Sequence, residues 1–311
     1  MRRPEGARRG CRWIACLLCL LCLPGVQAAR ALDCPPLVER AAAAHPVRYA
    51  DSLLWEVRRA GLPVSYVFGT IHLGDAAVAS PGPAVTRALA ATSAFAMEVL
   101  FDPGTLADVS DVMQLPGDAR LRDLVGDELF TRTVALLRAY GVTSDLADRL
   151  KPWAAYTTLS LPPGQHALPL DLVLMGRAQA AGKRLFGLET LAEQTAVFDA
   201  LAPAIQVALL RESVCHHARF QADTAALIGH YAAGDSAALY RLAHRYESPA
   251  QTRLMETLLV ARNRRMVERL QVFLAREAVF VAIGALHLPG ADGVLAGLAA
   301  AGFELRPVPV R

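Results

Sequence analysis

The chain carries one short pattern twice, once near each end. "FGTIHL" at 68–73 and "IGALHL" at 283–288 share Gly-x-x-His-Leu, and each follows an apolar run typical of a buried strand. Glycine lets a backbone turn sharply or approach a neighbour closely, so each histidine is expected beyond the carboxyl end of its strand, where open α/β sheets keep their ligand sites. If the two strands are parallel neighbours, both imidazoles face one crevice although 215 residues separate them in sequence.

The rest of the chain contains both strand-like and helical stretches. Strand-like runs lie at 52–57, 64–71, 94–100, 184–188, 278–286 and 303–310. Helical patterns lie at about 83–92, 126–139, 168–181, 190–201, 203–232, 236–245 and 249–275. This order predicts an α/β fold with a central mixed sheet, built from the N- and C-terminal portions, and a large helical insertion at about 103–275 that caps it.

The first 28 residues have the pattern of a secretory signal. Five arginines precede an apolar stretch from 13 to 23, and Val26-Gln27-Ala28 offers a small-residue cleavage site. The apolar stretch is shorter than the roughly 20 residues that a membrane-spanning helix needs. We therefore expect residues 29–311 to be a single periplasmic or secreted domain with no membrane span.

Removal of this segment changes the charge and the cysteine content. It takes away five arginines and Glu5, which leaves 27 basic and 28 acidic residues and shifts the formal net charge from +3 to −1. A nucleic-acid-binding domain keeps a basic patch, so we expect no nucleic-acid partner; the oligomeric state stays open. Of six cysteines only Cys34 and Cys215 remain, and these either pair in an oxidising compartment or persist as buried thiols.

A third polar residue interrupts an apolar run. "AFAMEVL" at 94–100 places Glu98 inside a predicted strand, and an ionised carboxylate buried there must be paired, protonated or bound to a metal. Arg262 and Asn263 interrupt the apolar stripe of the helix at 249–275 from its inner side. Buried polar groups need partners, and a carboxylate is the natural partner of an arginine.

Two imidazoles and a carboxylate are a ligand set that suits a catalytic divalent metal. The hypothesis is that His72 and His287 bind the metal, Glu98 is a ligand or the general base, and Arg262 with Asn263 orients Glu98 or stabilises an oxyanion. Such a site favours hydrolysis, because a metal makes hydroxide available near neutral pH. The alternatives are a non-catalytic protein that binds a peptide or a metal in the same pocket, and a structural role in which the histidines fix the sheet by hydrogen bonds.

The motifs together resemble those of the TraB/GumN family. The resemblance rests on "YVFGTIHLG", "AMEVL", "KPW" at 151–153, "GLET" at 187–190, "ARNRRM" at 261–266 and "VAIGALHLPG" at 281–290, which extend over nearly the whole mature chain. The family is similar to the Tiki metal-dependent proteases and, more distantly, to the erythromycin esterase and ChaN groups of related α/β architecture. The resemblance implies a metallopeptidase-like hydrolase of a peptide or amide substrate, with manganese or cobalt as the metal and zinc as a further possibility.

The resemblance also implies roles for single residues. His72, His287 and Glu98 would form the catalytic or metal-binding centre, and Arg262 and Asn263 match a further polar motif. Gly69 and Gly284 support the two histidine motifs, and Glu189 is the acidic residue of "GLET". Asp171 follows Pro169 at the start of a predicted helix, where it most simply caps or charges the N-terminus.

Overall fold

The computed structural model describes residues 32–41, 46–100, 109–164 and 167–310. The expected signal segment lies outside them. The strands are β1 (Leu54–Arg58), β2 (Ser65–Thr70), β3 (Ala94–Met97), β4 (Arg184–Gly187), β5 (Val279–Gly284) and β6 (Glu304–Val308). They form one mixed sheet in the order β4-β3-β5-β2-β1-β6. The predicted α/β class and the mixed central sheet with a helical insertion are therefore confirmed.

Four neighbouring strands run parallel, and β1 and β6 complete the sheet through antiparallel pairing. β5 pairs in parallel with β2 on one side and with β3 on the other, and β3 pairs in parallel with β4. β1 pairs antiparallel with both β2 and β6. Because β2 and β5 are parallel neighbours, the two Gly-x-x-His segments leave the sheet at the same end, where the carboxyl ends of the parallel strands lie.

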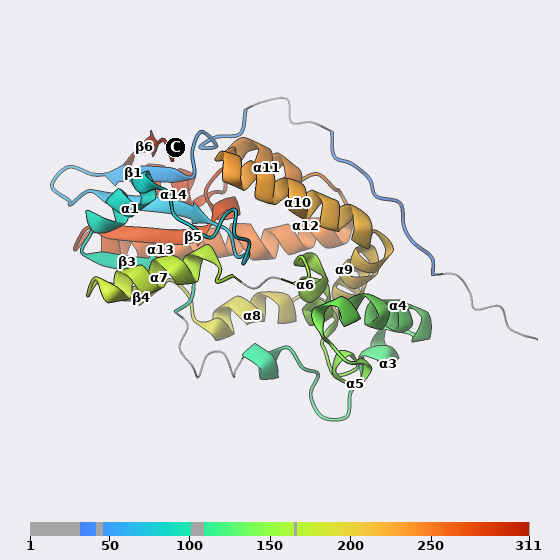
Figure 1. The fold of residues 1–311 in the computed structure, drawn as a ribbon. Helices are drawn as coiled ribbons and strands as arrows, with labels where there is room; N and C mark the ends of the chain where they lie inside the picture. Colours follow the sequence, from blue (N-terminus) through green and yellow to red (C-terminus); the bar gives the residue numbers. More distant parts are fainter. Residues whose placement is uncertain (1–31, 42–45, 101–108, 165–166, 311) are drawn as a thin grey trace, which may run out of the picture.

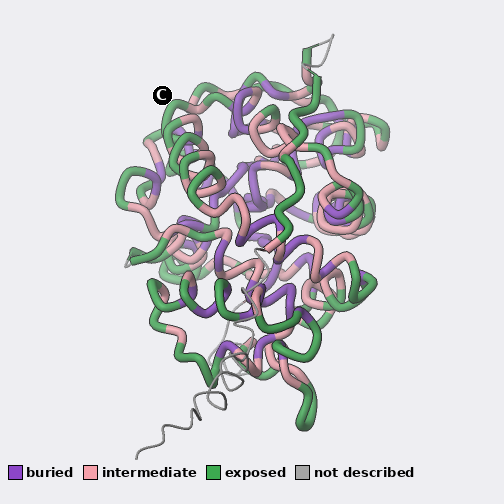
Figure 2. The backbone as a smooth tube through the Cα atoms, turned by 90° about the vertical axis from the view of Figure 1, so that its right-hand side faces the viewer, coloured by how far each residue is buried: buried purple, intermediate pink, exposed green. Residues whose placement is uncertain are grey.

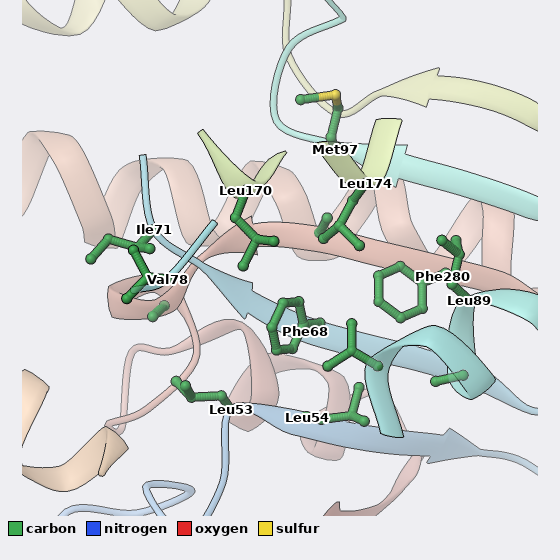
Figure 3. Packing of buried hydrophobic residues seen from close by; sticks show 14 of the residues in the cluster. Leu53, Leu54, Phe68, Ile71, Val78, Leu89, Met97, Leu170, Leu174 and Phe280 are labelled. Carbon is green, nitrogen blue, oxygen red and sulfur yellow. The ribbon is translucent and has the colours of Figure 1, made fainter. Parts of the chain in front are cut away.

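Helices cover both faces of the sheet. One face packs on α1 (Pro83–Ala90) and α7 (Leu170–Ala180), and the other on α13 (Arg262–Leu274) and α14 (Val294–Ala300). β5 shows why: Phe280 and Ala282 point to the first face, and Val279, Val281 and Ile283 to the second. The period of two buries apolar residues on both sides, as expected of a parallel strand covered by helices. Figure 3 shows the first face, where Phe68 and Phe280 pack beneath Leu170 and Leu174.

The insertion has its own apolar core. Besides α7 and α13, the described part of the insertion contains the helices α3 (Leu121–Val125), α4 (Asp127–Leu137), α5 (Ser144–Ala147), α6 (Pro152–Ser160), α8 (Leu191–Asp199), α9 (Pro203–Cys215), α10 (His217–Ala233), α11 (Ser236–Ala243) and α12 (Pro249–Met255). Helices α3 to α6 and α9 bury side chains against one another, apart from the sheet (Figure 1). Figure 2 shows buried backbone inside both parts and exposed backbone on the outer turns.

Three predicted elements differ from the observed ones. β3 ends at Met97, so Glu98 does not lie inside the strand but directly after it. The helix expected at 203–232 is two helices, because His216 between them has φ −117° and ψ 24° and breaks the helical backbone. The helix expected at 249–275 is continuous, but its middle, Glu256–Ala261, is a π-helical turn between α12 and α13.

Cys34 and Cys215 form a disulfide. It joins the N-terminal segment to the end of α9, so of the two alternatives left open by the sequence the pairing is the one found in the structure. Of the helices in the described ranges, none combines the length and the apolarity needed to cross a bilayer.

Candidate functional site

The candidate site lies at the carboxyl ends of the parallel strands. His72 follows β2, Glu98 follows β3, and His287 follows β5 in the short 3₁₀ turn Ala285–His287. Glu189 follows β4, where its N–H donates to the carbonyl oxygen of Glu98 at 2.7 Å. The carboxyl ends of parallel strands are the usual place for a ligand in an open α/β sheet.

Gly284 leaves the space that the three side chains share. A Cβ atom at this position would lie 3.1 Å from His72 Nε2, 3.2 Å from Glu98 Oε1 and 3.5 Å from His287 Cδ2. The φ of Gly284 is −52°, which any residue adopts, so glycine is needed here for space and not for backbone freedom. The absent side chain leaves a small polar hollow surrounded by two imidazoles and a carboxylate.

His72 is held by a buried carboxylate on another element. Its Nδ1 lies 2.8 Å from Oδ2 of Asp171 in the first turn of α7, and its Nε2 lies 3.5 Å from Glu98 Oε1. An ionised carboxylate only accepts, so Nδ1–H donates to it and Nε2 is left facing Glu98. Desolvation acts to lower the pKa of His72, but the charges of Asp171 and Glu98 outweigh it and hold that pKa well above its usual value.

His287 is held by an amide instead. Its Nδ1 lies 2.5 Å from Oδ1 of Asn263, whose Nδ2 donates to the carbonyl oxygen of Asp292 at 2.8 Å. That second bond fixes the orientation of the amide, so His287 Nδ1–H donates and Nε2 faces Glu98 Oε1 at 3.7 Å. Burial lowers the pKa of His287 to about 4, so the ring is neutral near pH 7.

Glu98 is bonded through both of its oxygens. Oε1 accepts the N–H of Gly284 at 2.7 Å and faces the two histidines. Oε2 accepts from Arg262 at 2.6 Å and from Gln194 of α8 at 3.0 Å. Burial acts to raise the pKa of Glu98, but the two histidines and Arg262 outweigh it and keep that pKa well below its usual value.

Arg262 links Glu98 to a second buried carboxylate. Its guanidinium donates to Glu189 Oε2 from Nε at 2.9 Å and from Nη2 at 2.7 Å, besides the bond to Glu98. Arg265 donates to Glu189 Oε1 at 2.5 Å. Removing one partner from such a buried network leaves an uncompensated charge and costs about 3–5 kcal/mol. The network therefore fixes the carboxylate of Glu98 relative to the histidines.

Gly69, the glycine of the other motif, serves packing. A Cβ atom here would lie 2.9 Å from the Cα of Ala285 and 3.1 Å from its Cβ. The absent side chain thus lets β2 approach the 3₁₀ turn that carries His287. The carbonyl oxygen of Gly69 also accepts the hydroxyl of Tyr231 at 2.7 Å.

The structure brings together His72, Glu98, His287 and Arg262, and it changes the expected contacts of others. Asn263 bonds to His287 and not to Glu98. Asp171 lies in the first turn of α7, as expected, and its carboxylate faces His72. Asp171 lies in an apolar run, "LPLDLVL", and the same signal that singled out Glu98 applies to it.

The sequence gives no indication that Gln194 belongs to the site, because its neighbours in sequence do not distinguish it from an exposed helical residue. The threonine of "GLET", Thr190, caps α8 together with Glu193, and this capping box brings Gln194 within reach of Glu98.

The donor set suits a divalent metal. Two ligands about 2.1 Å from a tetrahedral ion lie about 3.4 Å apart, close to the 3.5 and 3.7 Å between Glu98 Oε1 and the two Nε2 atoms. Neutral imidazole nitrogens and a carboxylate oxygen are the ligands that zinc, manganese and cobalt accept. Among the described residues no three His, Cys, Asp or Glu side chains already have the arrangement of a metal site.

Comparison with known proteins gives one match. A model of the TraB/PrgY/gumN family matches residues 53–307, which include every residue of the candidate site. Neither a curated protein nor a solved structure matches the chain.

Proposed function

Because the chain belongs to the TraB/PrgY/gumN family, we propose that it is a metal-dependent hydrolase of peptide or related amide bonds, exported to the periplasm or secreted. His72, His287 and Glu98 would hold the divalent ion. Manganese or cobalt is the metal expected from the similarity to the Tiki proteases, and zinc suits the same ligands.

The observation that supports the proposal most strongly is what surrounds Gly284 on the side where it lacks a side chain. Three potential ligands from three strand ends surround the position of its missing Cβ.

The partners of the histidines support metal binding over a purely structural role. A histidine that binds a metal usually donates its other N–H to a carboxylate or a carbonyl oxygen, which fixes its tautomer and orientation. Asp171 and Asn263 accept these bonds from Nδ1 of His72 and His287. Both Nε2 atoms therefore keep a free lone pair whenever the rings are neutral.

A divalent metal would make hydroxide available near neutral pH and would polarise the amide carbonyl. Glu98 Oε1 lies at the hollow, where it serves as a ligand or accepts a proton from the attacking water. Arg262 and Gln194 hold the other oxygen of Glu98 and so prevent the carboxylate from rotating. The guanidinium of Arg262 already donates to two carboxylates, which supports a role in orienting Glu98.

The test is to purify residues 29–311, measure bound manganese, cobalt and zinc, and repeat the measurement with His72→Ala and His287→Ala. We expect about one ion per chain in the native protein and a large loss in both variants. Unchanged metal content in both variants would defeat the assignment.

Turnover separates the hydrolase from the alternative of a peptide- or metal-binding protein. The hydrolase cleaves members of a broad peptide library, loses this activity on chelation and regains it when manganese is added back. Peptide or metal binding without turnover would favour the binding protein.

A further inference from the structure

Thr70 is a buried polar residue at the end of the sheet that carries the candidate site. It is the last residue of β2, two residues before His72, and its exposed fraction is 2%. Within the ranges that the structure describes, its hydroxyl oxygen has no hydrogen-bond partner. Tyr231, which packs on the same face of the sheet, donates its hydroxyl to the carbonyl oxygen of Gly69 at 2.7 Å. A buried hydroxyl without a partner destabilises a fold, so this oxygen is suited to a partner from outside the chain.

The strand register places this hydroxyl beside the hollow at Gly284. β2 and β5 pair in parallel, with Phe68 opposite Ala282 and Thr70 opposite Gly284. Phe68 and Ala282 both point to the face that α1 and α7 cover. Because side chains alternate with a period of two, Thr70 and the missing side chain of Gly284 point to that same face. Neighbouring strands are about 4.8 Å apart, so the two positions are adjacent.

Gly284 lies between Thr70 and Glu98. β5 is the middle strand of three, with β2 on one side and β3 on the other, and Glu98 directly follows β3. The missing Cβ of Gly284 lies 3.1 Å from His72 Nε2 and 3.2 Å from Glu98 Oε1. The hollow is therefore bordered by an imidazole nitrogen, by a carboxylate oxygen and, on the side of β2, by a hydroxyl.

Neither the strand nor the motif requires this hydroxyl. Valine has the same branched shape as threonine, is equally at home in a strand and buries no polar atom. The second Gly-x-x-His motif has Ala285 at the position that corresponds to Thr70, so the pattern forms without a hydroxyl there. Packing alone thus gives no reason for threonine at the end of β2.

A water molecule in the hollow would provide the missing partner. It would meet Thr70 Oγ1, Glu98 Oε1 and His72 Nε2, and a buried water makes about three hydrogen bonds. A hydroxyl both donates and accepts, whereas the ionised carboxylate only accepts. Thr70 can therefore accept the proton of the water that does not face Glu98.

From this geometry we propose that Thr70 is a further catalytic residue, whose hydroxyl accepts a hydrogen bond from the water that attacks the substrate. This bond fixes the orientation of the water and so directs one of its lone pairs toward the carbonyl carbon. Thr70 itself neither gains nor loses a proton. The role in the attack rests on the proposed function, whereas the binding of a water by Thr70 in the hollow does not.

High-resolution diffraction, with and without manganese, tests the binding of the water. The native protein should show a water oxygen about 2.5–3.0 Å from Thr70 Oγ1. Thr70→Val keeps the shape of the side chain without its hydroxyl and should lose this water. A hollow without water in both native forms, the same water in Thr70→Val, or a manganese ion bound directly by Oγ1 would overturn the proposal.

The stability of the metal-free protein separates this role from a structural one. Thr133 is the matched control, because it is buried in α4 and its hydroxyl donates to the carbonyl oxygen of Leu129 at 2.7 Å. Thr133→Val removes that bond and should lower the melting temperature by about 2–4 °C. Thr70→Val should keep or raise the melting temperature, since no group of the protein loses a partner. Equal losses in the two variants would show that the Thr70 hydroxyl is structural.

Kinetics with bound manganese tests the role in the attack. Thr70→Val should lower kcat about 10- to 100-fold, because the attacking water is no longer oriented. KM and manganese affinity should stay close to their native values, since neither depends on this hydroxyl. Thr70→Ser keeps the hydroxyl and should recover most of kcat, and Thr133→Val should have the native kcat.

The outcomes separate this inference from the proposed function. Metal-dependent cleavage with a native kcat in Thr70→Val keeps the hydrolase and refutes the role of Thr70. A water held by Thr70 in a protein that cleaves no peptide keeps the water site and refutes the hydrolase, and with it the part of Thr70 in the attack.

Discussion

The two Gly-x-x-His segments share a sequence pattern and lie at the same end of the sheet, but they differ in exposure and in their hydrogen-bond partners. The His72 side chain is 58% exposed and bonded to the carboxylate of Asp171, whereas the His287 side chain is 6% exposed and bonded to the amide of Asn263. Gly69 permits close backbone packing, and Gly284 leaves the hollow open. One imidazole thus belongs to the core and the other to the surface.

The two imidazoles therefore differ in protonation and in contact with solvent. The buried histidine, whose pKa is lowered to about 4, is neutral near pH 7 and is held in place by Asn263. The exposed histidine is in contact with solvent, and its Nδ1 is bonded to the buried carboxylate of Asp171. The same sequence pattern therefore places one histidine in the core and one at the surface.

The largest expected difference is between alanine substitutions of the two glycines, which should affect metal affinity and stability differently. Gly284→Ala fills the hollow with a methyl group about 3 Å from His72 Nε2 and Glu98 Oε1, so metal affinity should fall more than about 100-fold, beyond the effect of losing a supporting residue. The melting temperature should fall less than in Gly69→Ala, because the methyl group at Gly284 meets the ends of side chains whereas at Gly69 it meets backbone. Calorimetric titration with manganese and thermal unfolding measure the two effects.

Gly69→Ala is the matched control and should behave in the opposite way. Its methyl group meets the backbone of Ala285 at 2.9 Å, and overpacking of this kind costs about 1–3 kcal/mol of unfolding free energy. If Gly69→Ala kept its stability, or if Gly284→Ala bound metal normally, the contrast drawn between the glycines would be wrong.

Replacing the histidines one at a time comes next. His72→Ala and His287→Ala should each remove most metal binding, but only His287→Ala should strongly destabilise the fold. It creates a cavity in the core and leaves Asn263 Oδ1 without its partner, so the free energy of unfolding should fall by about 2–4 kcal/mol. His72→Ala should cost about 1 kcal/mol, because water reaches Asp171 through the space left by an exposed ring. Urea unfolding without metal checks this difference; equal losses would contradict it.

Replacing the residues that hydrogen-bond to the histidines should have smaller effects on metal affinity and on stability. Asp171→Ala and Asn263→Ala should each weaken metal binding about 10- to 100-fold. Only Asn263→Ala should also cost about 1–3 kcal/mol of stability, since His287 Nδ1 is then buried without an acceptor. Asp171→Asn can still accept from His72 and is expected to retain more affinity than Asp171→Ala. An Asp171→Ala protein with native affinity would remove Asp171 from the site.

The pH dependence should differ in sign between the two rings of the metal-free protein. The stability that neutral His287 contributes is present above about pH 6.5 and is lost as the pH falls toward 4, because the unfolded chain takes up the proton first. The raised pKa of His72 gives a contribution present below pH 6.5 and lost as the pH rises through its folded value. NMR titration of the two ring signals measures both; two ordinary midpoints near 6.5 would refute the difference.

The sequence predicted most of the sheet and the meeting of three site residues. β3 and β5 are continuous apolar runs, the first followed by Glu98 and the second ending at Gly284, and this signal is local. His72 and His287 could be paired across 215 residues because a repeated motif implied neighbouring strands.

What the sequence could not predict depends on tertiary contacts. Glu98 seemed to lie within its strand, because nothing local shows that β3 ends one residue earlier, at Met97. The partner of Asn263 depends on how the phase of α13 is set by the preceding π turn, and π turns have no simple periodicity in sequence. Asp171 was visible as an acid in an apolar run, but only the docking of α7 on the sheet brings it to His72.

The most direct test of the account is anomalous diffraction from crystals of residues 29–311 grown with manganese. It predicts one strong peak in front of Gly284, within about 2.0–2.4 Å of His72 Nε2, His287 Nε2 and Glu98 Oε1. An empty hollow at saturating manganese, or a peak bound only by residues elsewhere, would contradict it.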